Sequence, residues 1–92
     1  MKLTKTKING LFSKLDKGWK LLGNKKIVRE FSFDDYKSGI RFVNKTARLA
    51  EVGNHHPDIY FSYRKVKVTL STHEVRGLSE KDFAMALRID SL

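Results

Sequence analysis

The chain has 92 residues, of which 40% are hydrophobic and 11% aromatic, a composition that predicts one packed domain over residues 1–92. It has no cysteine, which excludes disulfides, thiolate metal sites and cysteine nucleophiles, and no apolar run approaches the roughly 20 residues of a membrane span. The net charge is +9, with nine Lys and Arg against one acid in residues 1–29, but charge without a motif is weak evidence for nucleic-acid binding. We therefore expect a soluble, cytoplasmic protein with no membrane partner and no nucleic-acid partner.

The first predicted element is a short amphipathic helix that starts at an N-cap, Thr4, and ends by Gly18. Its apolar face is formed by Ile8, Leu11, Phe12 and Leu15. Two strands follow, at residues 19–22 and 26–33, around the hairpin signal Gly23-Asn24. Arg29 interrupts the apolar alternation of the second strand, which indicates either a bulge or a face that is only partly covered.

A long helix is predicted from about residue 35 to residue 52, because apolar residues recur there with a period close to 3.6. Ser32 and Asp35 resemble a capping box at its start. Gly53 is expected just beyond its end, with Pro57 shortly after.

Residues 58–72 alternate between apolar and polar side chains and predict two further strands with a tight connection near Arg64. If the second strand stays regular, His73 lies on the face opposite its buried residues, where a ligand can reach it. The last helix is predicted to start at the N-cap Ser79, with Asp82 as the capping-box partner. The element order α-β-β-α-β-β-α predicts an α+β fold in which three helices pack on one face of a four-stranded antiparallel sheet.

All three histidines lie at the ends of predicted elements: His55 and His56 after the long helix, and His73 after the last strand. A histidine has an ordinary pKa of about 6.5 and can give or take a proton near neutral pH. Glu51 precedes His55 by one helical turn and could orient an imidazole. Taken alone, His-His-Pro is most often a surface turn. Zinc binding is a further alternative that the spacing does not favour.

The sequence resembles the pterin-4a-carbinolamine dehydratases over nearly its whole length. In that family an acidic residue, His-His-Pro, an aromatic residue, a further His and an Asp follow in order. Here this pattern is met by Glu51, His55, His56, Pro57, Tyr63, His73 and Asp82. Flanking segments such as Gly18-Trp19 and Leu70-Ser-Thr-His-Glu74 match as well.

The resemblance implies a lyase that dehydrates 4a-hydroxy-tetrahydrobiopterin to quinonoid dihydropterin during tetrahydrobiopterin recycling, without a metal or redox cofactor, in a homodimer or homotetramer. It implies His55, His56 and His73 as catalytic acids and bases. The substrate-binding residues are expected to be Glu51, Asn54, Ser71, Thr72, Glu74 and Asp82. The alternative is a small basic binding or adaptor module with a vestigial pterin site, which contacts nucleic acid or a protein partner.

Overall fold

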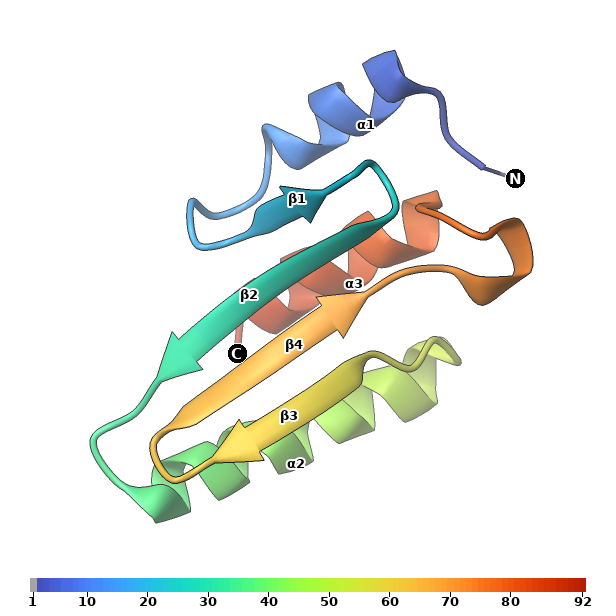
Figure 1. Ribbon diagram of the computed structural model, residues 1–92. Helices are drawn as coiled ribbons and strands as arrows, with labels where there is room; N and C mark the ends of the chain where they lie inside the picture. Colours follow the sequence, from blue (N-terminus) through green and yellow to red (C-terminus); the bar gives the residue numbers. More distant parts are fainter. Residues whose placement is uncertain (1) are drawn as a thin grey trace.

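The computed structural model describes residues 2–92, which form a four-stranded antiparallel sheet and three α-helices (Figure 1). In chain order the elements are α1 (Lys5–Phe12), β1 (Lys20–Leu22), β2 (Lys26–Ser32), α2 (Tyr36–Gly53), β3 (Asp58–Ser62), β4 (Lys65–Leu70), the 3₁₀-helix η1 (His73–Val75) and α3 (Glu80–Asp90). The predicted α+β fold and its element order are confirmed.

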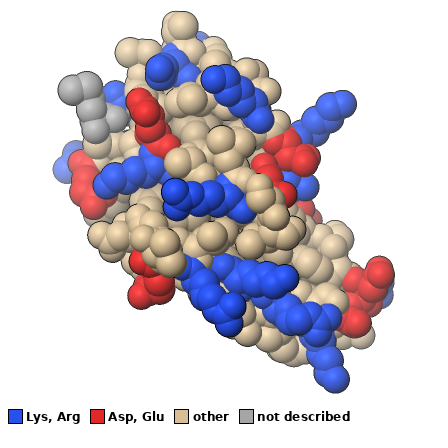
Figure 2. Space-filling model, turned by 180° about the vertical axis from the view of Figure 1, so that it is seen from behind, with Lys and Arg blue, Asp and Glu red and all other residues tan. Residues whose placement is uncertain are grey.

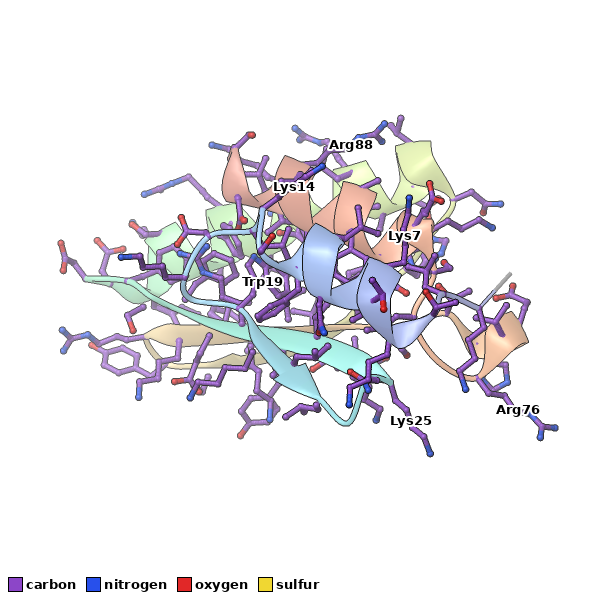
Figure 3. All side chains as sticks on the ribbon, turned by 90° about the horizontal axis from the view of Figure 1, so that it is seen from above. Lys7, Lys14, Trp19, Lys25, Arg76 and Arg88 are labelled. Carbon is purple, nitrogen blue, oxygen red and sulfur yellow. The ribbon has the colours of Figure 1, made fainter. Side chains whose placement is uncertain are left out.

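The strands lie in the order β1-β2-β4-β3, so the two hairpins are joined through the central pair β2 and β4. β2 and β4 pair in a continuous antiparallel register from Ile27 opposite Leu70 to Ser32 opposite Lys65. The three helices cover one face of this sheet, as the view in Figure 3 shows. In residues 2–92 the other face of the sheet carries no helix, and α1 lies beside the outer edge of β1 (Figure 1).

The core lies between the covered face of the sheet and the inner sides of the helices. Alternate residues of β4 are fully buried, as the period of two predicts: Val66, Val68 and Leu70. The helices add buried side chains to the same cluster: Ile8, Phe83, Met85 and Ile89. Burying one large apolar side chain stabilises the fold by about 1.5–3 kcal/mol, so this cluster supplies most of the driving force for folding.

The hairpin between β1 and β2 turns at Gly23 and Asn24, as predicted. Both residues have positive φ angles, 55° and 58°, which a type I′ turn requires. The Lys25 N–H donates to the Leu22 carbonyl at 3.0 Å and closes the turn.

Arg29 lies on the core side of β2 and pairs with Asp90 at the end of α3. Its Nη1 donates to Asp90 Oδ1 at 2.8 Å, and its guanidinium lies 4.5 Å from the centre of the Phe31 ring. Trp19 Nε1 donates to the same carboxylate at 2.8 Å. The register continues without interruption through Arg29, which faces Val68. Arg29, paired with Asp90, therefore fills its place on the core side of β2. The bulge that the sequence allowed is not formed.

The first helix is capped as predicted but is shorter than expected. Thr4 Oγ1 accepts a hydrogen bond from the Lys7 N–H at 3.2 Å, and the helix ends at Phe12, well before Gly18. Gly18 has a different role, because a Cβ there would lie 2.5 Å from Arg29 Nε. Its small size lets the chain pass close to the Arg29 side chain.

The start of α2 also differs from the expectation. Asp35 is the N-cap, and its Oδ1 accepts a hydrogen bond from the Ser38 N–H at 2.8 Å. Ser32 is still in β2, opposite Lys65, so it cannot cap the helix.

Basic side chains are numerous on the helical face of the molecule (Figure 2). Four of them recur at helical spacing along α2, with no acidic residue between the first and the last: Lys37, Arg41, Lys45 and Arg48. The charge excess was expected in residues 1–29 alone, and this row on α2 was not predicted. Within residues 2–92, no helix is both long enough and apolar enough to cross a membrane.

Candidate functional site

His55 follows α2 directly and is held by a Schellman motif at the end of that helix. Asn54 adopts a left-handed conformation, with φ 49° and ψ 41°. The His55 N–H donates to the Ala50 carbonyl at 3.1 Å, and the Asn54 N–H donates to the Glu51 carbonyl at 3.4 Å. These bonds fix the backbone from which the His55 side chain projects.

Gly53, not Asn54, was predicted to lie just beyond the helix. Gly53 is instead the last helical residue, where a Cβ would lie 3.1 Å from Met85 Cε. Its small size allows α3 to approach the end of α2. Asparagine takes the left-handed position because its short polar side chain tolerates that conformation.

The imidazole of His55 is paired with a buried carboxylate. His55 Nε2 lies 2.6 Å from Asp82 Oδ1, and the two side chains are 12% and 0% exposed. A carboxylate only accepts hydrogen bonds, so the proton in this contact lies on Nε2. In the neutral ring Nδ1 is then unprotonated and can accept a proton.

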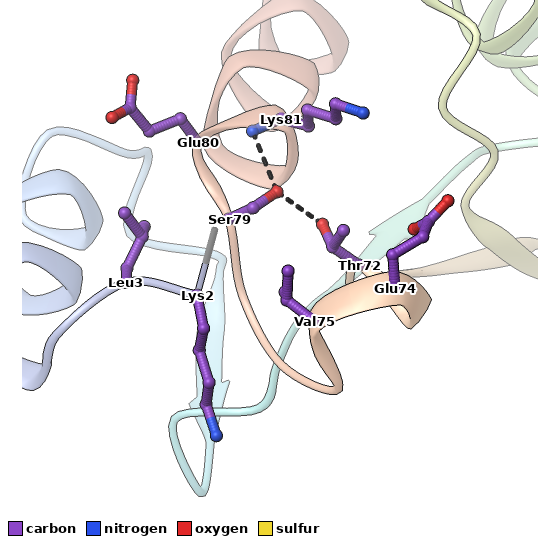
Figure 4. Close-up of a pocket in the computed structure, with 8 residues that line it drawn as sticks. All are labelled: Lys2, Leu3, Thr72, Glu74, Val75, Ser79, Glu80 and Lys81. Atoms are coloured by element: carbon purple, nitrogen blue, oxygen red, sulfur yellow. Dashed lines mark hydrogen bonds between the residues drawn. The ribbon is translucent and has the colours of Figure 1, made fainter.

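Asp82 also links His55 to the loop between β4 and α3. Its Oδ2 accepts hydrogen bonds from Thr72 Oγ1 at 2.7 Å and from the Ser79 N–H at 3.0 Å. Figure 4 shows the further bond between the Thr72 and Ser79 hydroxyls, 2.6 Å apart. Ser79 caps α3 and forms the predicted capping box with Asp82. Asp82 and Thr72 were predicted to contact the substrate. Both are buried, and their side chains bind protein groups.

His56 lies on the surface and pairs with Glu51. His56 Nε2 is 2.6 Å from Glu51 Oε2, and the side chains are 57% and 76% exposed. The two neighbouring histidines therefore have separate carboxylate partners, one exposed and one buried. Glu51 orients His56 and not His55.

His73 opens η1 and is exposed. The sequence predicted the face on which His73 lies from a strand that continues to it. β4 ends at Leu70, so no strand decides where this side chain lies. Thr72 instead forms an isolated bridge with Gly77, and the chain turns back through η1 with Arg76 in the left-handed conformation. Ser71 is half-buried beside this turn.

Glu74, in the same turn, has a carboxylate whose pKa is lowered from the ordinary value of 4.5. The main cause is the hydrogen bond from its own backbone N–H. Desolvation opposes this shift of the pKa, and Lys81, His73 and His55 each add a smaller lowering effect through their charge. His55 precedes β3 and His73 follows β4, and the pairing of Asp58 with Thr69 places both positions at the same open end of this hairpin. There Asp82 bonds both His55 and Thr72, the residue before His73. The structure thus brings the two chain segments of the predicted site together.

Two hollows lie on either side of Lys81. One, of about 430 Å³, is lined by Lys2, Leu3, Thr72, Glu74, Val75, Ser79, Glu80 and Lys81 (Figure 4). The other, of about 300 Å³, lies between the end of α2 and α3 and is lined by Val52, Gly53, His55, Lys81, Ala84, Met85 and Arg88. Both volumes are at the small end of the range for ligand sites.

Three residues of this region were not predicted to belong to the site: Ser79, Lys81 and Arg88. The capping box was a usable signal for Ser79, since a cap that precedes a motif aspartate positions that aspartate. Lys81 and Arg88 gave no such signal in a chain with 19 Lys and Arg.

The donor set does not form a metal centre in the part of the chain that the structure describes, where no three His, Asp or Glu side chains are grouped to hold an ion. What the site offers is an oriented imidazole with a free Nδ1, two more exposed imidazoles, and the exposed turn that begins η1. This arrangement suits proton transfer to and from a small substrate.

The sequence model of the family described as "Pterin 4 alpha carbinolamine dehydratase" matches residues 1–92. A curated protein of Sulfurisphaera tokodaii is 42% identical over 91 residues, which cover 99% of this chain and 96% of that protein. One of Nostoc is 46% identical over 90 residues, covering 98% and 95%. Both carry the provisional name pterin-4-alpha-carbinolamine dehydratase.

Two solved structures are also similar. A crystal structure of a transcriptional coactivator/pterin dehydratase from Brucella melitensis superposes with a TM-score of 0.92 at 35% identity, covering 99% of this chain and 97% of the other. A pterin dehydratase-like protein identified as a RuBisCO assembly factor of the alpha-carboxysome has a TM-score of 0.69 at 28% identity, covering 80% and 87%.

Proposed function

The chain belongs to the pterin-4-alpha-carbinolamine dehydratase family, and on that premise we propose that it dehydrates a 4a-hydroxy-tetrahydropterin, such as 4a-hydroxy-tetrahydrobiopterin, to the quinonoid dihydropterin. The observation that carries the proposal is the pair of His55 with buried Asp82, which leaves Nδ1 of an oriented imidazole free to take a proton. No metal or redox cofactor enters the reaction.

The chemistry needs one base and one acid. The N5 lone pair expels the hydroxyl from C4a, the C4a–O bond breaks as an acid protonates the leaving oxygen, and a base removes the N5 proton. The products are the quinonoid ring and one water. Each well-placed acid or base typically accelerates such a step 10²–10⁴-fold.

We assign the base to His55 Nδ1, because Asp82 occupies Nε2 and fixes the ring. His56 and His73 are assigned as the acids that protonate the hydroxyl, one for each face of the substrate ring. Both are exposed, so a ligand can reach them. Glu51 accepts the Nε2–H of His56, so His56 is assigned as an acid in its protonated form, through Nδ1–H, with the Glu51 carboxylate stabilising that form.

The substrate ring is proposed to lie against Asn54 and the turn from Ser71 to Glu74, whose backbone groups can bind the flat edge of a pterin. For Asp82 and Thr72 we propose a positioning role, since their side chains already bind one another inside the protein.

The test supplies freshly generated 4a-carbinolamine and follows the appearance of quinonoid dihydropterin above the spontaneous rate. His55→Ala and His73→Ala are each expected to lower the enzymatic rate at least tenfold while circular dichroism shows an unchanged fold. Wild-type rates in both variants would show that the assignment is wrong.

We also propose that the protein acts in the cytoplasm as a homodimer or homotetramer. Within residues 2–92 no strand pairs with the outer edge of β3. Apolar and aromatic side chains are exposed on and near this strand and α2: Tyr36, Val52, Tyr60 and Tyr63. Light scattering coupled to gel filtration measures the assembly, and a monomer at micromolar concentration would contradict it.

The second candidate function is a binding module, favoured by the row of basic residues on α2. Such a row attracts nucleic acid through its phosphates, and binding then weakens steeply with salt. A steep salt dependence together with an absence of dehydratase activity would favour this candidate over the enzyme.

A further inference from the structure

The hollow between the end of α2 and α3 combines the proposed base with two cations. His55 lines it from the end of α2, while Lys81 and Arg88 line it from α3. The two α3 residues are seven positions apart, about 10.5 Å along the helix axis. Small or flexible side chains, Ala84 and Met85, lie between them and leave the space open.

Neither cation is committed to a partner in the structure. Across residues 2–92, no salt bridge or side-chain hydrogen bond engages Lys81 Nζ or the Arg88 guanidinium. The side chain of Lys81 extends from α3 toward the end of α2 in Figure 4, on the same side as Glu74. Arg88 lies on the outer side of the helical layer in Figure 3, and a Cβ on Gly53 would be 3.6 Å from its Nη1.

Two unpaired cations beside a reactive imidazole indicate a ligand with negative charge. An ammonium and a guanidinium together suit a phosphate, because the guanidinium can donate two parallel hydrogen bonds and the ammonium adds a point charge. A neutral, hydroxylated side chain on the pterin would leave both cations without a partner.

We propose that the natural substrate is a pterin whose side chain carries a phosphate ester, and that Lys81 and Arg88 bind this phosphate in the hollow beside His55. This inference rests on the proposed dehydratase function and adds the substrate class. Lys81 and Arg88 are then specificity-determining residues that distinguish phosphorylated from unphosphorylated pterins.

The experiment compares two pairs of probes that differ only in the phosphate. Dissociation constants are measured by pterin fluorescence for neopterin and neopterin monophosphate, and kcat/KM is measured for the 4a-carbinolamines of their tetrahydro forms. The wild type is expected to favour the phosphorylated probe at least tenfold in both measurements. The preference is expected to decrease as salt is raised.

Lys81→Gln and Arg88→Gln are each expected to lower affinity and kcat/KM about tenfold for the phosphorylated probe. For the neutral probe both quantities should change less than twofold. Arg88→Lys should restore part of the preference, which a merely structural role of Arg88 would not produce. Lys14→Gln, which removes one positive charge from the segment after α1, is the matched control and should retain the wild-type preference.

The outcomes separate this inference from the dehydratase proposal. Dehydration of both substrates with equal kcat/KM, or equal dissociation constants for the two probes, would overturn the phosphate site and leave the enzyme assignment intact. Tighter binding of the phosphorylated probe, lost in the glutamine variants but without dehydration of either substrate, would support the site and refute the enzyme assignment.

Discussion

Replacing Asp82 with asparagine removes a buried charge with little change in shape. The carboxylate accepts hydrogen bonds from Thr72 Oγ1 and the Ser79 N–H, both of which an amide oxygen can still receive. A hydrogen bond to a charged group contributes about 1.5–3 kcal/mol and a neutral one about 0.5–1.5 kcal/mol, so each bond weakens by about 1 kcal/mol. We expect the free energy of unfolding to fall by about 2 kcal/mol, and Tm by about 8–16 °C for a chain of this size.

The same change is expected to lower the dehydration rate 10²–10⁴-fold, the usual contribution of one base. The amide nitrogen can donate to His55 Nε2, which moves the ring proton to Nδ1 and removes the acceptor that the reaction needs. The assay is single-substrate dehydration kinetics at a temperature well below the Tm of the variant, with urea denaturation measured in parallel.

Asp90→Asn provides the matched control. Asp90 is also a largely buried aspartate of α3, and it accepts hydrogen bonds from Trp19 and Arg29 at the end far from the histidines. The Asp90→Asn variant should lose a similar free energy of unfolding and keep the wild-type dehydration rate. Equal rates for wild type and Asp82→Asn, with the expected loss of stability, would show that Asp82 only stabilises α3 and that the tautomer argument is wrong.

Gly18→Ala is expected to lower the free energy of unfolding by about 1–3 kcal/mol, because the new Cβ would lie 2.5 Å from Arg29 Nε and force that side chain to move. Gly10→Ala, in a helix with open space around it, should raise stability by up to about 1 kcal/mol, and urea denaturation distinguishes the two. The depressed pKa of Glu74 means that its carboxylate stays ionised as pH falls below 4.5, so any stability it contributes is lost only below that pH. Lys81→Gln should raise the pKa of Glu74 in a carbon-detected NMR titration, because the Lys81 charge helps to lower it. An unchanged titration midpoint would contradict this effect of Lys81 on Glu74.

The order of elements was predictable because periodicity and turn residues agree over most of the chain. The hairpin at Gly23-Asn24 and the capping box at Ser79 are local signals, and the structure confirms both. Helix ends were less predictable. The sequence offers Ser32 as a cap for α2, but strand pairing with β4 holds it in β2, and Asp35 takes the position.

The histidine segments were identified from their residue types and from the family resemblance. Which carboxylate pairs with which histidine was not predicted. Glu51 was the evident partner for either histidine of the pair, being close in sequence. The partner of His55 proved to be Asp82, 27 residues away, because packing of α3 against the end of α2 buries that carboxylate beside the ring. Contacts of this kind depend on tertiary packing and leave no local pattern.

Asp82 couples the loss of activity on heating to the stability of the first turn of α3. The carboxylate that holds His55 also closes the first turn of α3, so fraying of that turn releases the imidazole at the same moment. Inactivation should therefore precede global unfolding, and its temperature dependence should follow amide hydrogen exchange in the first turn of α3 more closely than exchange in β4.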